Sequence, residues 1–280
     1  MKTRLITSAI ILAVIIPVIL LSEYLVYPIA MGILCLFATY EMLRVMGYDK
    51  RWAVSAPAYV IALLLPLFTH NIFLGDDWHT RVAYMLIAAA AVFAYLLYLM
   101  GAAVFSKGEM SMAKVGEVFF AVTYIVISFT SLSLLRYVHN GDLCFILVFL
   151  CAWICDSCAY LVGSFIGKHK LIPEISPKKT VEGAVGGVVC AVLGFLLYGL
   201  IIDLCTDREV RYIVLALAGL VLSVVSQIGD LIASLIKREH GVKDYGTLLP
   251  GHGGIMDRFD SILAVSTPLI AICLVFPPFV

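Results

Sequence analysis

Three aspartates near the C-terminal end of the sequence have the type and spacing expected of metal ligands. Asp257 and Asp260 are three residues apart, so they face the same side of any helix that has begun there. Asp230 lies in the preceding apolar segment, where a carboxylate is costly and usually faces a protein interior. Carboxylate oxygens suit Mg²⁺, which takes few protein ligands together with water and phosphate oxygens, whereas zinc prefers His or Cys. We therefore predict that Asp230, Asp257 and Asp260 form a magnesium site.

Basic residues and glycines surround these aspartates within a stretch of 36 residues, from Ser226 to Ser261. The basic residues are Lys237, Arg238, Lys243 and Arg258. The run Gly251–Gly254 can present backbone N–H groups to phosphate. An acidic cluster, positive charge and a glycine loop are the parts of metal-assisted phosphoryl transfer.

Each of these parts also has an ordinary structural interpretation. Asp230 alone could belong to a proton relay or an ion pair, Asp257 and Arg258 could be a helix-end pair, and His252 could be a turn residue. Ser223, Ser226, Asp230, Ser234 and Lys237, however, recur at spacings of three and four along one apolar segment. Such a stripe indicates a face turned toward the interior of a helix bundle.

A second polar segment runs from Asp156 to Gly187. Asp156, Tyr160, Gly163 and Gly167 share one helical stripe. Further on, Ser176–Thr180 places two lysines and two hydroxyls in a predicted Pro-bounded turn before a Gly-rich helix start. Lysines, hydroxyls and helix N-termini suit phosphate, although lysines in such a loop also serve as ordinary membrane-side anchors.

The elements that must position these residues are membrane-spanning helices. Hydrophobic residues make up 62% of the chain and charged residues 14%, against about 25% charged in soluble domains. A span needs about 20 mostly apolar residues. The sequence predicts an all-α polytopic membrane protein with about nine spans: 5–23, 27–45, 52–69, 82–105, 115–135, 142–164, 183–203, 211–236 and 261–280. The first is read as a retained span, since no clear signal-peptide cleavage site follows it.

The distribution of basic residues predicts the orientation. When the N-terminus and the loops after spans two, four, six and eight are placed on one side, that side holds 15 Lys and Arg residues and the other holds 4. Short cytoplasmic loops carry this excess, so we expect a cytoplasmic N-terminus, an outside C-terminus and both polar segments facing the cytoplasm. Within one membrane domain, residues 1–140 are predicted to form a scaffold with lipid or dimer contacts, and residues 141–280 to carry the active site.

Net charge and cysteine usage exclude other classes. The formal net charge is zero, so no bulk attraction to nucleic acid is expected. Cys155 and Cys158 have metal-type spacing, but no second Cys pair or His partner accompanies them, which argues against zinc. The eight cysteines imply no disulfide framework.

Together these motifs resemble one family. The C-terminal run reads Ser234-x-x-Lys237-Arg238, Lys243-Asp244-x-Gly246, Pro250-Gly251-His252-Gly253-Gly254 and Asp257-Arg258-x-Asp260-Ser261. The earlier run reads Asp156-x-x-Ala159-Tyr160, Gly167-Lys168-His169-Lys170-Leu171 and Ser176-Pro177-Lys178-Lys179-Thr180-x-Glu182-Gly183. Both are similar to the phosphatidate cytidylyltransferase (CDP-diacylglycerol synthase) family, in its bacterial plasma (inner) membrane form. The resemblance covers about residues 150–261 and is only architectural before them.

The resemblance implies that CTP and phosphatidic acid give CDP-diacylglycerol and pyrophosphate, with Mg²⁺ and a second ion that is K⁺ or Mg²⁺. It implies metal roles for Asp230 and Asp257, with Asp260 in support. The catalytic residues expected are Asp230, Lys237, Arg238, Asp257 and Arg258. The residues expected to bind the nucleotide or lipid phosphates are Lys178, Lys179, Lys243, Asp244, His252, Gly253 and Gly254. Membrane lipids are expected partners, and a homodimer is expected by analogy with the family.

Two rival functions follow from the same residues. A CTP-dependent lipid-alcohol kinase would share the nucleotide and the membrane setting, but would release lipid phosphate and CDP. An ion-coupled transporter could use Asp156 and Asp230 as its ion site. A transporter would need neither the Gly-His-Gly-Gly loop nor the ring of basic residues, so the sequence favours the transferase.

Overall fold

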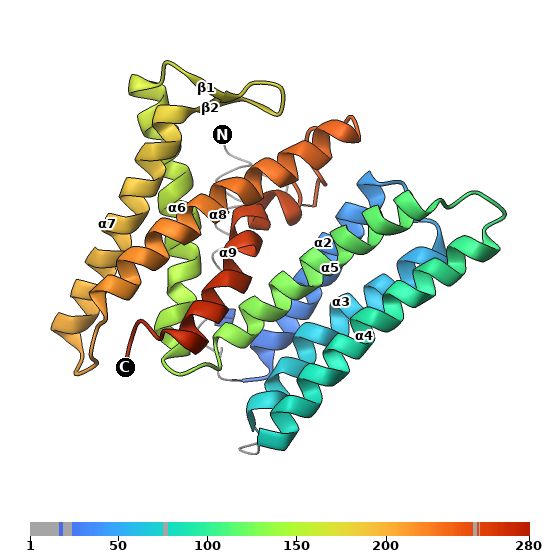
Figure 1. Ribbon diagram of the computed structural model, residues 1–280, viewed down its shortest axis with the longest axis horizontal. Helices are drawn as coiled ribbons and strands as arrows, with labels where there is room; N and C mark the ends of the chain where they lie inside the picture. Colours follow the sequence, from blue (N-terminus) through green and yellow to red (C-terminus); the bar gives the residue numbers. More distant parts are fainter. Residues whose placement is uncertain (1–16, 19–23, 75–77, 249–250, 252) are drawn as a thin grey trace. The chain divides into compact units, whose positions relative to one another are not determined.

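The computed structural model describes residues 17–18, 24–74, 78–248, 251 and 253–280, and in this part the chain is mainly helical (Figure 1). The helices are α2 (Val26–Val45), α3 (Trp52–Leu74), α4 (Trp78–Phe105), α5 (Met112–Leu135), α6 (Gly141–Ile166), α7 (Val181–Cys205), α8 (Tyr212–Glu239) and α9 (Met256–Val275). The strands are β1 (Lys170–Ile172) and β2 (Ser176–Thr180). The chain divides into two compact units, residues 1–134 with 244–257 and residues 135–243 with 258–280.

All eight described helices are long and apolar enough to cross a membrane. This confirms the prediction of an all-α polytopic membrane protein. The predicted span 5–23 falls outside the described residues apart from residues 17 and 18, so the number nine and the sides of the termini stay predictions. The last span was predicted from residue 261, but α9 begins at Met256, which puts Asp257 and Asp260 inside a helix.

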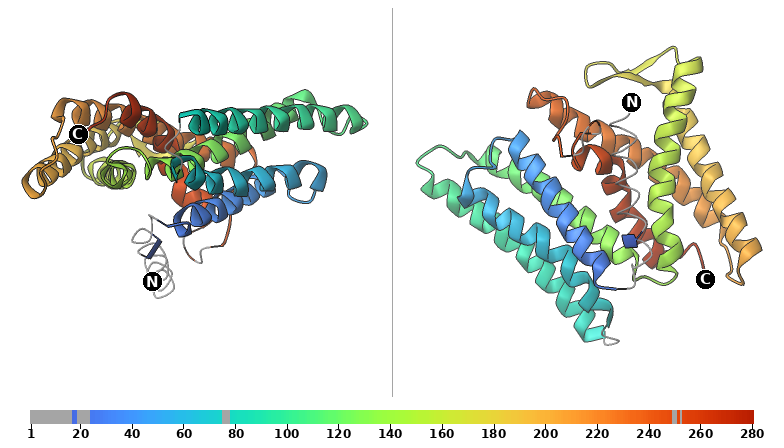
Figure 2. Two further views of the ribbon diagram at one scale, coloured as in Figure 1. Left: turned by 90° about the horizontal axis from the view of Figure 1, so that it is seen from below. Right: turned by 180° about the vertical axis from the view of Figure 1, so that it is seen from behind.

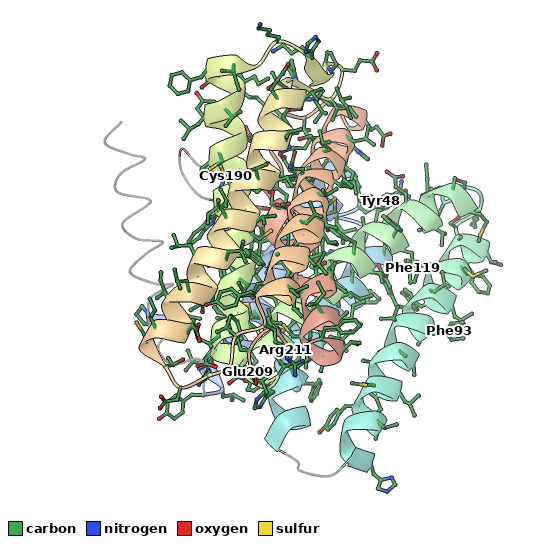
Figure 3. All side chains as sticks on the ribbon, turned by 60° about the vertical axis from the view of Figure 1, so that its left-hand side comes forward. Tyr48, Phe93, Phe119, Cys190, Glu209 and Arg211 are labelled. Carbon is green, nitrogen blue, oxygen red and sulfur yellow. The ribbon has the colours of Figure 1, made fainter. Side chains whose placement is uncertain are left out.

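The first unit is held together by polar contacts between helices as well as by apolar packing. The Tyr27 hydroxyl on α2 donates to the Leu132 carbonyl oxygen of α5 at 2.9 Å. The Thr69 and Ser133 hydroxyls join α3 to α5 at 2.7 Å. Outward-facing side chains such as Phe93 on α4 are large, apolar and exposed, as expected of a surface that faces lipid (Figure 3).

In the second unit, glycines bring α6 and α7 into close contact along their length (Figure 2). A β-carbon at Gly183 would lie 2.5 Å from the Ala159 carbonyl oxygen, and one at Gly187 would lie 2.8 Å from the Cys155 carbonyl oxygen. These positions repeat every four residues, which is the small-residue spacing that lets membrane helices approach closely. The Gly-rich start of α7 is therefore a packing surface.

Helices α8 and α9 also approach closely, because Gly229 has no side chain to separate it from Ala264. On α8, Ser223 and Ser226 are fully buried, which confirms that the polar stripe faces the interior. At the other end of this unit, the C-terminal residues pair with the α7–α8 connection near Glu209 and Arg211 (Figure 3). The Glu209 and Val280 backbones exchange two hydrogen bonds of 3.0 Å.

The polar segment between α6 and α7 is an antiparallel hairpin. Ser176–Thr180 form strand β2, with Thr180 opposite Lys170, and not the Pro-bounded turn that the sequence predicts. The Thr180 hydroxyl then caps α7 by accepting the Gly183 N–H at 3.1 Å. The Glu182 carboxylate accepts the backbone N–H groups of Lys168 and His169, which anchors the start of the hairpin to α7.

Candidate active site

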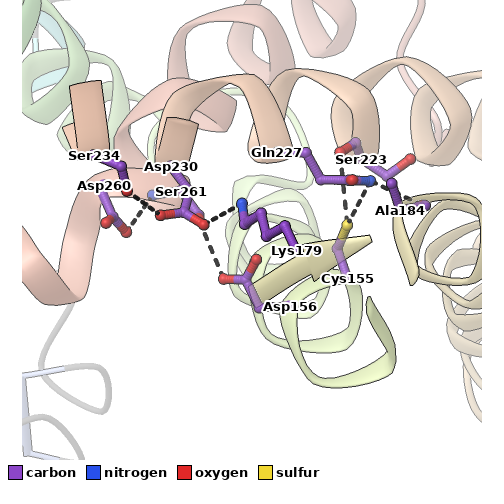
Figure 4. Close-up of polar contacts among 10 residues, drawn as sticks. All are labelled: Cys155, Asp156, Lys179, Ala184, Ser223, Gln227, Asp230, Ser234, Asp260 and Ser261. Atoms are coloured by element: carbon purple, nitrogen blue, oxygen red, sulfur yellow. Dashed lines mark hydrogen bonds and ion pairs between the residues drawn. The ribbon is translucent and has the colours of Figure 1, made fainter. Parts of the chain in front are cut away.

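An ion pair between Lys179 and Asp230 lies at the centre of the polar residues of the second unit (Figure 4). Lys179 comes from β2 and Asp230 from the polar stripe of α8. The two side chains are 24% and 25% exposed, so the pair is largely withdrawn from solvent. The Ser234 hydroxyl, one turn further along α8, reaches the other oxygen of Asp230 at 3.5 Å.

Two more carboxylates lie beside this pair, linked through one serine (Figure 4). The Ser261 hydroxyl donates to Asp156 at 3.1 Å, and the Ser261 backbone N–H donates to Asp260 at 2.8 Å. Asp230 interacts electrostatically with both Asp156 and Asp260. Helices α6, α8 and α9 therefore each contribute one acidic side chain to the same neighbourhood.

These residues fit an oxygen-binding cation better than zinc. Asp156, Asp230 and Asp260 offer only oxygen ligands, and Lys179 offsets part of their charge. In the described part of the chain, no group of three or more His, Cys, Asp and Glu side chains is spaced to hold a metal ion. Mg²⁺ commonly uses one or two carboxylates and completes its octahedron with water and substrate phosphates, so the donor set fits Mg²⁺.

Strand geometry separates two lysines that are adjacent in the sequence. Successive side chains of a strand point to opposite faces. Lys179 accordingly turns toward Asp230, whereas Lys178 is exposed. Both lysines are predicted phosphate ligands, but of the two only Lys179 lies in the acidic cluster.

The basic residues at the end of α8 lie near the same cluster and the hairpin. Lys237 interacts electrostatically with Asp260. The Arg238 guanidinium makes long contacts of 3.5 Å with the carbonyl oxygens of Ile175, in the hairpin, and Val242. Lys243, Asp244 and Arg258 are exposed. Of the predicted basic residues, Lys179 and Lys237 therefore interact with the carboxylates of the cluster.

In the first unit, Asp257 organises the glycine-rich loop that precedes α9. One oxygen of its carboxylate accepts the backbone N–H of Tyr245 at 2.8 Å and that of Gly254 at 3.0 Å. Gly253 adopts a φ of +85°, and a β-carbon there would lie 2.9 Å from the same oxygen. Asp257 thus links Tyr245 to Gly254 through one carboxylate oxygen, a role that no sequence motif indicated. His252 lies outside the described residues.

Glu41 on α2 carries a buried carboxylate, 3% exposed, that no sequence motif identified. Its Oε2 accepts the backbone N–H of Met256, the first residue of α9, at 2.9 Å. The signal was present in the sequence, because an acidic residue inside an apolar span is costly and marks a functional or structural partner. Glu41 is far from the recognised motifs in the chain, so no spacing rule connected it to them.

The described helices and these polar residues define a many-span membrane protein with a cluster of charged side chains among apolar helices. Comparison with known proteins identifies the family. The model of the cytidylyltransferase family matches residues 2–276, so the chain belongs to this family. It is therefore a nucleotidyltransferase.

Named relatives are similar over nearly their whole length. The phosphatidate cytidylyltransferase of Bacillus subtilis (strain 168) is 38% identical over 273 residues, covering 95% of this chain and 94% of the relative. That of Staphylococcus aureus (strain COL) is 37% identical over 275 residues, covering 98% and 99%. That of Staphylococcus haemolyticus (strain JCSC1435) is 34% identical over 275 residues, with the same coverage.

Proposed function

We propose that this protein transfers the cytidylyl group of CTP to phosphatidic acid, giving CDP-diacylglycerol and pyrophosphate. The names of its relatives and its family support this reaction. The observation that carries the proposal is the acidic cluster of Asp156, Asp230 and Asp260 with Lys179 inside a bundle of apolar helices. Such a cluster is costly in a membrane protein and serves the binding of charged groups.

The proposed chemistry is a direct displacement at phosphorus. An oxygen of the lipid phosphate bonds to the α-phosphorus of CTP, and the bond from that phosphorus to the bridging oxygen of the β-phosphate breaks to release pyrophosphate. The second pKa of a phosphate monoester is about 6, so the nucleophile is already anionic near neutral pH and needs little help from a base. The main barrier is the repulsion between two anions.

The residues of the cluster would lower this barrier by placing charge. Lys179 and Lys237 would attract phosphate oxygens and offset their negative charge, and Lys179 is held in position by its ion pair with Asp230. Mg²⁺ held by Asp230 and Asp260 would stabilise the charge that develops on the α-phosphate and on the departing pyrophosphate. Asp257, which the family signature also assigns to metal, remains a predicted ligand.

The membrane setting suits these substrates. The acyl chains of phosphatidic acid can stay in lipid while CTP enters from the aqueous side. The excess of basic residues on one side of the spans, 15 against 4, favours a site that faces the cytoplasm in a bacterial plasma (inner) membrane. The homodimer expected by analogy stays a prediction.

The test is an assay of product formation by the purified protein in phospholipid nanodiscs. Phosphatidic acid, CTP labelled at the α-phosphate and Mg²⁺ are expected to give labelled CDP-lipid and unlabelled pyrophosphate in equal amounts. Asp230→Asn, which keeps the shape of the side chain but removes its charge, is the matched negative control. Release of CDP with formation of lipid phosphate from a lipid alcohol would support the kinase instead. Absence of Mg²⁺-dependent CDP-lipid would overturn the proposal.

A further inference from the structure

The start of α9 is held by a residue from a distant part of the sequence. Met256 is the first residue of α9, and its N–H is one of the four that have no acceptor within the helix. Glu41, 215 positions earlier on α2, supplies that acceptor at 2.9 Å. A carboxylate at a helix N-terminus is also favoured by the helix dipole. Glu41 therefore caps α9 from outside the helix.

The glycine-rich loop before α9 is packed onto the same carboxylate. Gly246 and Gly254 are both buried, and a β-carbon at either position would collide with the carboxylate of Glu41. Gly254 has no positive φ, so its lack of a side chain is required by space and not by backbone conformation. Two glycines of the loop are thus fitted to one side chain of α2.

Glu41 and Asp257 accept different backbone N–H groups of the segment that leads into α9. Asp257 accepts the N–H groups of Tyr245 and Gly254, while Glu41 accepts that of Met256. Loss of a buried acceptor leaves a backbone N–H group unpaired, which costs free energy and destabilises this conformation of the backbone.

We propose that Glu41 is a positioning residue that fixes Gly246, Gly254 and the first turn of α9. Its importance for turnover rests on the proposed function, since Asp257 and Arg258 are predicted to act on the substrates. Its effect on loop order does not rest on that function. The two effects can therefore be measured separately.

Hydrogen–deuterium exchange of the full-length, unliganded protein in nanodiscs measures the loop directly. Glu41→Ala is expected to speed exchange of peptides covering residues 244–257 by about 10- to 100-fold, the range for losing a buried bond to a charged group. Glu41→Gln keeps one acceptor oxygen, so its increase is expected to be smaller. Phe37→Ala truncates an exposed side chain of the same helix without removing an acceptor, and it is expected to leave these peptides close to the wild type.

A double-mutant cycle tests the packing of Gly254 against Glu41. Gly254→Ala alone is expected to speed loop exchange and to lower kcat, because its methyl group collides with the carboxylate. In the Glu41→Ala background the same substitution has space and is expected to cost much less. Such non-additivity is expected only of residues in contact. If Glu41→Ala does not fold, loop exchange in the Gly254→Ala and Glu41→Gln variants tests the inference instead.

Unchanged loop exchange in Glu41→Ala, an equal increase in Phe37→Ala, or additive effects in the cycle would each overturn the inference. In the activity assay, kcat is expected to fall in Glu41→Ala and to be partly restored in Glu41→Gln. If the wild type makes no CDP-lipid, the proposed function fails, and the exchange measurements still decide whether Glu41 orders the loop.

Discussion

Lys179 of β2 forms an ion pair with Asp230 of α8, so the hairpin between α6 and α7 is tied to the polar stripe of a helix that follows it in the chain. Its sequence neighbour Lys178 is exposed on the opposite face of the strand. Together with the contacts of Glu182 to Lys168 and His169, the pair attaches the polar hairpin to α7 and α8. It also predicts that two adjacent lysines differ in importance.

Lys179→Ala is therefore expected to lower kcat/KM for CTP by about 100-fold or more, the order expected for losing one charge that stabilises a transition state. Lys178→Ala, the matched control on the same strand, is expected to change it by less than about 5-fold, as for an exposed charge. Steady-state kinetics of both variants in nanodiscs measure the difference. Equal losses in the two variants would contradict the assignment of Lys179 to the acidic cluster.

Asp257→Asn is expected to abolish turnover while the protein stays folded. The amide oxygen of Asn can still accept the Tyr245 and Gly254 N–H groups, so the loop should keep its conformation, whereas the charge needed for a metal ion is lost. The measurement is CDP-lipid formation at several Mg²⁺ concentrations, with hydrogen exchange as the control for folding. Full activity at ordinary Mg²⁺ would remove Asp257 from the metal site.

Gly183→Ala is expected to destabilise the protein by about 1–3 kcal/mol, because its methyl group would lie 2.5 Å from the Ala159 carbonyl oxygen and would force α6 and α7 apart. Gly101 and Gly116 also lie in helices, but nothing lies within 4 Å of a β-carbon there. Alanine at these two control positions is expected to be neutral or to stabilise by up to about 1 kcal/mol. Thermal unfolding in detergent compares the three variants, and equal effects would argue against close packing at Gly183.

Cys155→Ala and Cys158→Ala are expected to keep activity close to that of the wild type. The Cys155 thiol is buried and contacts the Ser223 carbonyl oxygen and the Gln227 side chain, so its role is in packing (Figure 4). Activity and bound metal are measured side by side. Loss of activity together with loss of a bound metal ion in either variant would restore the zinc interpretation.

Much of the architecture was predictable, because a membrane imposes a simple rule. A span must be long, apolar and helical to satisfy its own backbone groups, and this rule located eight spans that correspond to α2–α9. Edges were less predictable, since a polar first turn such as Asp257–Asp260 counts against a hydropathy window although it is helical. The hairpin was missed because strands of three and five residues carry little periodic signal.

The sequence alone was enough to predict the class of the protein, its many spans and most of the charged residues that lie among the apolar helices. Hydropathy and short motifs are patterns within about 20 consecutive residues, so they can be read from the sequence without knowledge of the fold. The tertiary structure decided which residues meet. It paired Lys179 with Asp230, joined Asp156 to Asp260 through Ser261, and placed Glu41 at the start of α9. These contacts join residues far apart in the chain, and they depend on how the helices pack and not on any local pattern.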